Sequence, residues 1–326
     1  MMKSYFKVLN ICIAFVFFSC KTKQGNNALT VLKGSVFGTS YQIKYFNEVN
    51  YQKPIDSLFA LINKSLSTYI PTSDISKINR GDTTVVVDAF FVEVFKKAKK
   101  IYKQTDGYFD PTMGKLIDAY GFGSGKKRVD LSEMDIFKLR QAMGFDKVML
   151  KKNKVYRQNP NIELNVNAFA KGYGVDIIGR FLENKNIFNY LVEIGGEIRA
   201  RGNKNNNSWK VAVEKPNEDG TRSIHKIIEL NDESMATSGN YRKYKLNNKG
   251  QKIVHTINPK TGLAYENNLL SVSVLLKGDC ANADAYATAF LAMGFEKTKL
   301  FLQKYPELKV ILLYSDKDNK LKEFTN

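Results

Sequence analysis

Short stretches of alternating apolar and polar residues recur through the second half of the chain, with helical patterns before and after them. The alternating stretches cover 147–164, 188–201, 208–215, 224–230, 252–257 and 269–276. A two-residue period of this kind is typical of half-buried β-strands. The helical patterns do not alternate regularly with these stretches, as they would in a parallel βαβ fold. The sequence therefore predicts an α+β fold, with largely antiparallel or mixed sheets packed against helices.

Apolar residues at helical spacing predict the helices. One expected helix carries Ile55, Leu58, Phe59, Ile62 and Leu66; a second is capped by Asp88 and carries Phe91, Val94, Phe95, Ala98 and Tyr102. Further helices are expected from Ser132 to just before Gly144, over 281–293 and over 296–304, and strands on both sides of Gly38 and in LKVILLYS. A glycine-punctuated loop with a short helix is expected between the second and third of these helices.

The stretch ELNVNAFAKGYGVD, residues 163–176, combines a strand-like start with a run of small side chains. Lys171 stands between Ala170 and Gly172, and Val175 and Ile177 suggest that a helix follows. Small residues are common where a backbone must come close to a ligand or to another segment. We therefore expect something to approach the backbone around Lys171.

The first twenty residues are expected to direct export. An apolar run follows two lysines and ends at Ser19-Cys20, and it is too short to span a bilayer comfortably. This ending, followed by the polar KTKQGNN, resembles a bacterial lipoprotein signal; an ordinary signal peptide is the alternative. We expect a lipoprotein signal peptide at 1–19, lipidation at Cys20, a tether at 20–29 and one domain at 30–326. The protein would be exported and anchored to a membrane through its lipid, facing the periplasm.

The chain carries a formal net charge of +18. A basic balance is compatible with nucleic acid, anionic lipid or phosphate-bearing ligands. The sequence has no zinc-finger spacing, no RNP-like aromatic motif and no arginine-rich helix, so nucleic acid is not expected as a partner. Lysines on solvated faces explain most of the charge.

Asp284 and Thr288 are four residues apart in NADAYATAFLAMG, so a helix would place both on one face. A carboxylate and a hydroxyl on one helical turn suit Mg²⁺, which takes its other ligands from phosphate and water. An aspartate in the first turn of a helix can also merely favour the helix dipole. From these two residues alone, the simpler explanation is preferred.

Three further segments end in glycine turns: HTINPKTG (255–262), ATSGNY (236–241) and EIGGEIRARG (193–202). His255 precedes a turn in which Pro259 fixes φ and Gly262 ends the bend. Histidine can accept a proton near neutral pH, but a structural histidine would look the same in sequence. Each segment alone is a weak signal.

In order along the chain, GTSY, STY, DGYFDPTMGKL, NAFAKGYGVD, EIGGEIRARG, ATSGNY, HTINPKTG and ADAYATAFLAMG resemble the ApbE-type flavin transferase family, the FAD:protein FMN transferases. The resemblance extends from about residue 36 to 295. It implies an enzyme that binds FAD with Mg²⁺ and cleaves the pyrophosphate. FMN would pass through a phosphoester bond to a Thr or Ser of an acceptor flavoprotein, and AMP would leave.

The resemblance also implies residue roles. Mg²⁺ would be held by Asp284, Thr288 and the backbone oxygen of Ala168. The FAD site would include Phe37, Tyr69, Tyr108, Phe109, Asp110, Asn165, Lys171 and Ile257. His255 would be the general base. The ligand that approaches the backbone near Lys171 would then be the dinucleotide with its metal.

Two positions depart from the usual family pattern, because Asn165 and Asn258 stand where acidic residues are common. Neither is an implied metal ligand, but contacts to the nucleotide or the rigidity of the turn could change. Two alternatives stay open on the sequence. Water could replace the acceptor, which would make the protein an FAD pyrophosphatase, or the chain could be a flavin-binding lipoprotein without catalysis.

Overall fold

The computed structural model describes residues 28–125, 131–217, 219, 221–241, 244–248 and 250–326. The expected signal peptide, Cys20 and most of the tether lie outside them. An eight-stranded sheet has the order β1-β2-β5-β6-β9-β12-β13-β14, and neighbouring strands pair antiparallel throughout. Its strands are β1 (Leu29–Val36), β2 (Thr39–Phe46), β5 (Tyr190–Ile194), β6 (Glu197–Arg201), β9 (Ser234–Gly239), β12 (Leu269–Leu276), β13 (Lys309–Ser315) and β14 (Leu321–Thr325). The predicted α+β class with antiparallel sheets is confirmed.

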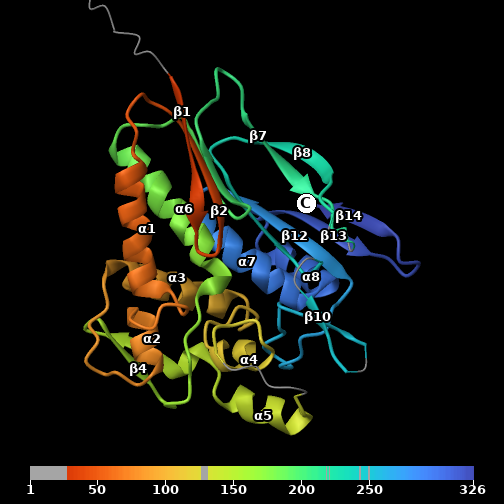
Figure 1. Cartoon of the computed structure of the whole chain (residues 1–326). Helices are drawn as coiled ribbons and strands as arrows, with labels where there is room; N and C mark the ends of the chain where they lie inside the picture. Colours follow the sequence, from red (N-terminus) through yellow and green to blue (C-terminus); the bar gives the residue numbers. More distant parts are fainter. Residues whose placement is uncertain (1–27, 126–130, 218, 220, 242–243, 249) are drawn as a thin grey trace, which may run out of the picture.

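Helices cover one face of this sheet and a β-hairpin covers part of the other (Figure 1). Helix α6 packs on β5 and β6, and α7 packs on β9 and β12. The helices of this layer are α1 (Gln52–Leu66), α3 (Ala89–Gln104), α6 (Asn167–Asn184), α7 (Cys280–Met293) and α8 (Phe295–Lys304). On the opposite face, β7 (Trp209–Glu214) and β8 (Ile224–Leu230) bury Trp209 and Leu230 against the sheet. The large core therefore lies between the sheet and the helices.

A second group of short elements lies beyond one end of the sheet (Figure 1). It contains α2 (Asp74–Asn79), α4 (Gly114–Ala119), α5 (Glu133–Gln141), the β3 (Val148–Lys151)–β4 (Lys154–Arg157) hairpin and the β10 (Tyr244–Leu246)–β11 (Lys252–Val254) hairpin. Leu116, Leu139 and Ile257 contribute to a small apolar cluster there. This group and the helix layer form the walls of the cavity described below.

The helices expected from spacing and capping are confirmed. Asp88 caps α3 by accepting a hydrogen bond from the Phe91 amide at 2.9 Å. Ser132 begins α5 through a reciprocal capping box with Asp135. Because these local signals agree with the buried apolar faces, the sequence alone was enough to locate these elements.

The expectation for residues 163–176 was wrong in its details. Helix α6 begins at Asn167, so the small residues that suggested a backbone approaching a ligand are already helical. A Cβ on Gly172 would lie 2.6 Å from the backbone oxygen of Cys280, and one on Gly174 would lie 2.5 Å from the ring of Phe37. These two glycines therefore allow close contact with α7 and with Phe37.

ATSGNY was expected to be a glycine turn, and this was also wrong. Residues 236–239 form the second half of strand β9, where they pair with β12. The strand lies between β6 and β12 within the sheet, so pairing on both sides overrides the turn propensity of serine and glycine. The chain leaves the sheet only at Asn240.

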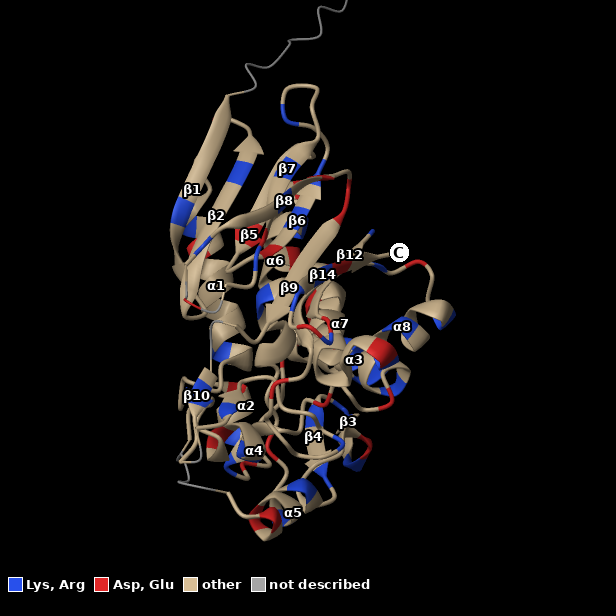
Figure 2. Cartoon of the chain, turned by 90° about the vertical axis from the view of Figure 1, so that its right-hand side faces the viewer, with Lys and Arg blue, Asp and Glu red and all other residues tan. Residues whose placement is uncertain are grey.

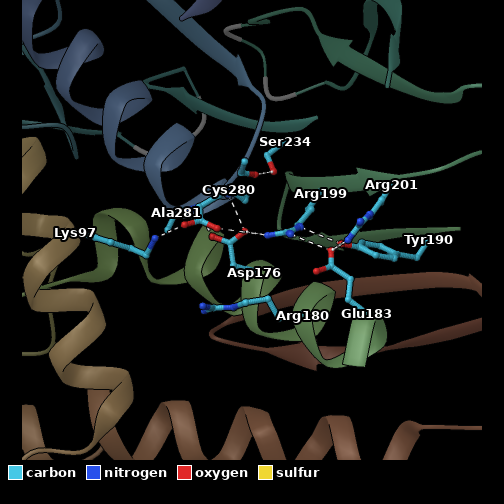
Figure 3. Close-up of polar contacts among 12 residues, drawn as sticks. Lys97, Asp176, Arg180, Glu183, Tyr190, Arg199, Arg201, Ser234, Cys280 and Ala281 are labelled. Carbon is cyan, nitrogen blue, oxygen red and sulfur yellow. Dashed lines mark hydrogen bonds and ion pairs between the residues drawn. The ribbon is translucent and has the colours of Figure 1, made fainter. Parts of the chain in front are cut away.

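A charged network fixes the start of α7 against α6 and β6 (Figure 3). The carboxylate of Asp176 is fully buried and accepts hydrogen bonds from the Cys280 and Ala281 amides at 2.8 and 2.9 Å. Arg199 pairs with Asp176 and with Glu183, at 3.0 Å each. Burial raises the pKa of Asp176 to about 6. The network sets the position of α7 and therefore of the polar residues further along it.

Lysine and arginine are spread over strands and helices in Figure 2, with acidic residues among them. Among the described residues no lysine or arginine is fully buried, in agreement with the expectation that most of the net charge of +18 lies on solvated faces.

Candidate active site

A cavity of about 450 Å³ lies between the ends of α1 and β9, the N-terminal part of α6, and loops at 108–113 and 255–257. Cavities of this size commonly bind small molecules and cofactors. Every residue implied for binding or catalysis lines it: Phe37, Tyr69, Tyr108, Phe109, Asp110, Asn165, Ala168, Lys171, His255, Ile257, Asp284 and Thr288. The fold therefore brings together residues that are up to about 250 positions apart in sequence.

Three oxygen-bearing groups converge where α6 and α7 cross. The Thr288 hydroxyl lies 3.3 Å from the backbone oxygen of Ala168 and 3.2 Å from the hydroxyl of Ser238. One turn earlier on α7, the buried carboxylate of Asp284 accepts a hydrogen bond from the Gly172 amide at 3.0 Å. Asp284 is the fifth residue of α7, so it lies beyond the first turn, and the helix-dipole explanation does not account for it.

Lys171 lies beside this group and forms an ion pair. Its Nζ lies 2.5 Å from Oε1 of Glu197, whose side chain is 1% exposed. Burial raises the pKa of Glu197, and the charge of Lys171 opposes this effect. Glu197 was not among the predicted site residues. Its only sequence signal is a carboxylate that directly follows the two glycines of EIGGEIRARG.

The balance of charge in the cavity favours a bound cation. Among the described lining residues, Asp110 and Asp284 carry carboxylates and Lys171 carries an ammonium, with Glu197 directly behind it. A phosphate-bearing ligand would add more negative charge. In the described part of the chain, no three His, Cys, Asp or Glu residues are grouped as metal ligands. One carboxylate, a hydroxyl and a backbone oxygen nevertheless fit Mg²⁺, which keeps phosphate and water ligands.

Phe37 forms part of an aromatic wall from a strained position. It occupies the tight turn between β1 and β2 with φ of 51°, followed by Gly38 with φ of 75°. A bulky residue in this left-handed region is uncommon, and such strain is concentrated at functional sites. The ring packs edge-on against Phe59 at 5.7 Å and lies close over Gly174. The turn therefore directs an aromatic ring into the cavity.

His255 directly follows β11 and is half-buried at the cavity wall. Its ring lies edge-on to Phe122, with 6.4 Å between the ring centroids. The other histidine, His225, instead pairs with Glu323 at 2.5 Å. Neither His225 nor Glu323 lines the cavity. Of the two histidines, only His255 is therefore placed to act on a ligand there.

Asn165 and Asn258, the two positions singled out in the sequence, both stabilise their turns through side-chain hydrogen bonds. The side-chain oxygen of Asn258 accepts hydrogen bonds from the Lys260 and Thr261 amides at 2.9 and 3.3 Å. The side-chain oxygen of Asn165 accepts one from the Asn167 amide at 3.0 Å, at the start of α6. The neutral amide oxygen is sufficient to accept these hydrogen bonds, so the turns form here without a charged side chain.

Several lining residues were not predicted. Thr237, Ser238 and Gly239 reach the cavity from the end of β9, within a segment that was mistaken for a turn. The remaining unpredicted residues are mostly apolar: Ile62, Asn63, Leu66, Ser67, Pro111, Met113, Ile117, Phe122, Asn167, Ala170 and Thr256. Apolar side chains of this kind cannot be told from core residues in a single sequence.

Residues 37–312 match the ApbE family. The chain belongs to the ApbE family. It is 32% identical over 306 residues to the FAD:protein FMN transferase of Haemophilus influenzae, which covers 89% of this chain and 87% of the relative. It is 35% identical over 276 residues to the FAD:protein FMN transferase of Vibrio cholerae, covering 82% of each chain.

Solved structures show the same ApbE fold. The flavin transferase ApbE from Vibrio cholerae has a TM-score of 0.82 at 31% identity, covering 92% of this chain and 97% of the other. The flavinyl transferase ApbE of Pseudomonas stutzeri has a TM-score of 0.81 at 25% identity, covering 92% and 95%. The likeness therefore extends over nearly the whole described domain.

Proposed function

We propose that this FAD:protein FMN transferase depends on Mg²⁺ and attaches FMN through a phosphoester bond to a Thr or Ser of an acceptor flavoprotein, releasing AMP. The transferase activity follows from membership of the ApbE family and from relatives of that name at 32% and 35% identity. The observation that carries the finer proposal is the single cavity in which an oxygen cluster, a lysine, aromatic rings and a histidine meet.

The cavity is lined by aromatic side chains, which suit the flat rings of FAD, and by polar groups, which suit its pyrophosphate and a metal ion. Phe37, Tyr69, Tyr108 and Phe109 offer aromatic faces and edges for flat rings. Lys171 and the oxygen cluster of Ala168, Asp284 and Thr288 offer a place for the pyrophosphate and its metal. Bound Mg²⁺ would draw negative charge from the phosphate oxygens as the phosphorus–oxygen bond breaks.

The residues of the chain would then supply positioning and one proton acceptor. Lys171 would offset charge on the pyrophosphate as a fixed ammonium. His255 would accept the proton of the acceptor hydroxyl while the oxygen of that hydroxyl forms a bond with the FMN phosphorus. The bond between that phosphorus and the bridging oxygen breaks in the same displacement, and this oxygen leaves with AMP as part of its negatively charged phosphate group.

Substitution of the proposed carboxylate ligand tests the metal site. Asp284→Ala should abolish Mg²⁺-dependent transfer of FMN while the protein still folds, because the carboxylate faces the cavity and makes one hydrogen bond. Asp318→Ala, which changes an exposed acid, is the matched control and should transfer normally. A folded Asp284→Ala protein that turns over FAD at the wild-type rate with Mg²⁺ would refute the assignment.

The anchoring of the protein is a separate proposal. An apolar run that ends at Ser19-Cys20, followed by a polar segment, supports export, lipidation of Cys20 and a position facing the periplasm. In the described part of the chain, the search for a helix able to cross a membrane found none. The lipid would then hold the enzyme at the membrane through the segment that precedes β1.

A further inference from the structure

Lys171 interacts electrostatically with two buried acids that come from different elements. Glu197 begins β6 and Asp284 lies on α7, and their side chains are among the buried polar residues at 1% and 3% exposure. The charges of both acids raise the pKa of Lys171, against the effect of its burial. The ammonium is therefore attracted by two carboxylates at once.

The ammonium pairs with only one of them. Its Nζ contacts Glu197 at 2.5 Å, whereas the carboxylate of Asp284 accepts its hydrogen bond from the Gly172 amide. Which acid holds Lys171 matters chemically, because an ammonium in contact with Asp284 would neutralise this carboxylate. It would also occupy space beside Asp284 that a divalent cation needs.

The environment of Glu197 indicates a role that depends on its charge. Its second oxygen, Oε2, is buried without a hydrogen-bond partner among the described residues. Leaving a buried acceptor unsatisfied is unfavourable, and burying a carboxylate is more so. An apolar side chain would pack at this position without these costs, so packing alone does not explain the residue.

We propose that Glu197 is a positioning residue that holds the Lys171 ammonium away from Asp284 and so keeps the Asp284 carboxylate available for a divalent cation. The inference rests on the proposed Mg²⁺ site. Glu197 acts here through Lys171 and does not itself touch the cation. Without the charge of Glu197, the ammonium would turn to its nearest remaining acid, Asp284, and compete with the metal.

The test measures metal binding directly. Mn²⁺ is titrated into the metal-free full chain, and free Mn²⁺ is followed by electron paramagnetic resonance. Glu197→Gln should weaken Mn²⁺ binding about tenfold or more, which corresponds to about 1.4 kcal/mol. Glu229→Gln is the matched control, because it removes an ion-paired carboxylate from the β7–β8 hairpin, away from Lys171 and from α7, and its Mn²⁺ affinity should be unchanged.

A double-mutant cycle shows whether Glu197 acts through Lys171. In a Lys171→Met background, Glu197→Gln should weaken Mn²⁺ binding by roughly threefold or less, because no ammonium is left to compete. An equal loss with and without Lys171 would mean that Glu197 acts only through its own charge. That result, or an unchanged affinity of the single Glu197→Gln variant, would overturn the proposal.

Glu197→Asp gives a second test that does not remove a charge. It keeps the carboxylate but shortens its reach by one methylene, so the grip on Lys171 should loosen and Mn²⁺ affinity should fall toward the value of Glu197→Gln. Wild-type affinity in this variant would contradict a positioning role, even if Glu197→Gln failed to fold. If neither the wild type nor Asp284→Ala binds Mn²⁺, the proposed metal site itself is wrong, and the inference fails with it.

Discussion

The carboxylate of Asp284 is held in an environment that disfavours its charge. Burial raises its pKa to about 6, while Lys171 and the Gly172 amide act in the opposite direction. Its side chain is almost completely inaccessible, and such an acid is stabilised by a proton or by a cation. The same feature that suits a metal site therefore makes the metal-free protein sensitive to pH.

Asp284→Asn should reveal this sensitivity as a difference in thermal stability. The pKa of Asp284 is raised from 3.8 to about 6, so its contribution to folding is largest below pH 3.8 and is lost as pH rises through 6. In the asparagine variant, the side chain at position 284 has no proton to gain or lose over this pH range. In metal-free buffer its melting temperature should rise relative to wild type between pH 4 and pH 7, by a few degrees, since ~1 kcal/mol corresponds to about 2–4 °C in a domain of 150–250 residues.

Added Mg²⁺ should make the wild type melt at a higher temperature than Asp284→Asn at pH 7. The wild type can bind the cation through Asp284, whereas the variant has lost that charge. Scanning calorimetry with and without Mg²⁺ measures both effects. A constant difference in melting temperature across the pH range would show that Asp284 is not perturbed as described.

His255→Ala should separate chemistry from binding. A hydroxyl is a weak nucleophile until its proton is taken, and loss of a general base typically costs about 10²–10⁴-fold in rate. The variant should bind FAD with near-normal affinity in calorimetry yet transfer FMN at least roughly a hundredfold more slowly in a gel assay of flavin fluorescence.

His225→Ala is the matched control, because this histidine pairs with Glu323 away from the cavity and its loss should leave transfer unchanged. Normal transfer by His255→Ala, or loss of FAD binding in it, would mean that His255 has a structural or ligand-binding role instead.

At the scale of elements, the contact between α6 and α7 determines the geometry of the oxygen cluster. Ala168 and Lys171 are carried by α6, and Asp284 and Thr288 by α7, so the register of the two helices sets every distance between them. Gly172 permits this contact. The carboxylate of Asp176 on α6 accepts hydrogen bonds from two backbone amides at the start of α7 and so holds the two helices together. A small shift of α7 would separate the groups proposed to hold the metal.

Gly172→Ala should therefore impair both stability and activity. The new Cβ would lie 2.6 Å from the Cys280 oxygen and 2.9 Å from the Ala281 Cα, so the backbones must move apart. Overpacking of this kind costs about 1–3 kcal/mol. Thermal melting should show the loss, and Mn²⁺ affinity should fall with it. Asn184→Ala, at the exposed end of α6, should change neither property; wild-type values for Gly172→Ala would show that the helices tolerate separation.

The elements that the sequence made predictable are those with a local signal. The caps at Asp88 and Ser132 and the apolar spacing of α1 and α3 belong to single segments, and these elements were located correctly. The start of α6 and strand β9 were not, because glycine and serine there are explained by α7 and by neighbouring strands distant in sequence. The cavity residues came from the order of eight motifs rather than from periodicity, and Glu197 required the ion pair with Lys171.

In the whole molecule, the eight-stranded sheet supports the cavity built from loops and helix ends, and the proposed anchor precedes its first strand. β1 begins at Leu29, so eight residues separate Cys20 from the first strand. An extended chain reaches roughly 3.3–3.6 Å per residue, which would keep the enzyme within about 30 Å of the membrane surface. Acceptor proteins at the same membrane would then be within reach.

Cys20→Ala tests the anchor. The variant should stay unprocessed or appear in the soluble fraction, because the residue that would carry the lipid is missing. Cell fractionation and the apparent mass on a gel measure both outcomes, and Cys280→Ala, which removes a buried thiol in the domain, is the control for loss of a cysteine. Unchanged processing and unchanged membrane association in Cys20→Ala would contradict lipidation.

The enzyme should transfer FMN to a protein rather than to water. Wild-type protein is mixed with FAD, Mg²⁺ and an acceptor flavoprotein that carries the target threonine, and released AMP and covalently bound flavin are counted together. We expect one covalent FMN for each AMP, no reaction when Mg²⁺ is removed by a chelator, and none when the acceptor threonine is changed to valine. AMP release without covalent flavin in the presence of the intact acceptor would contradict it.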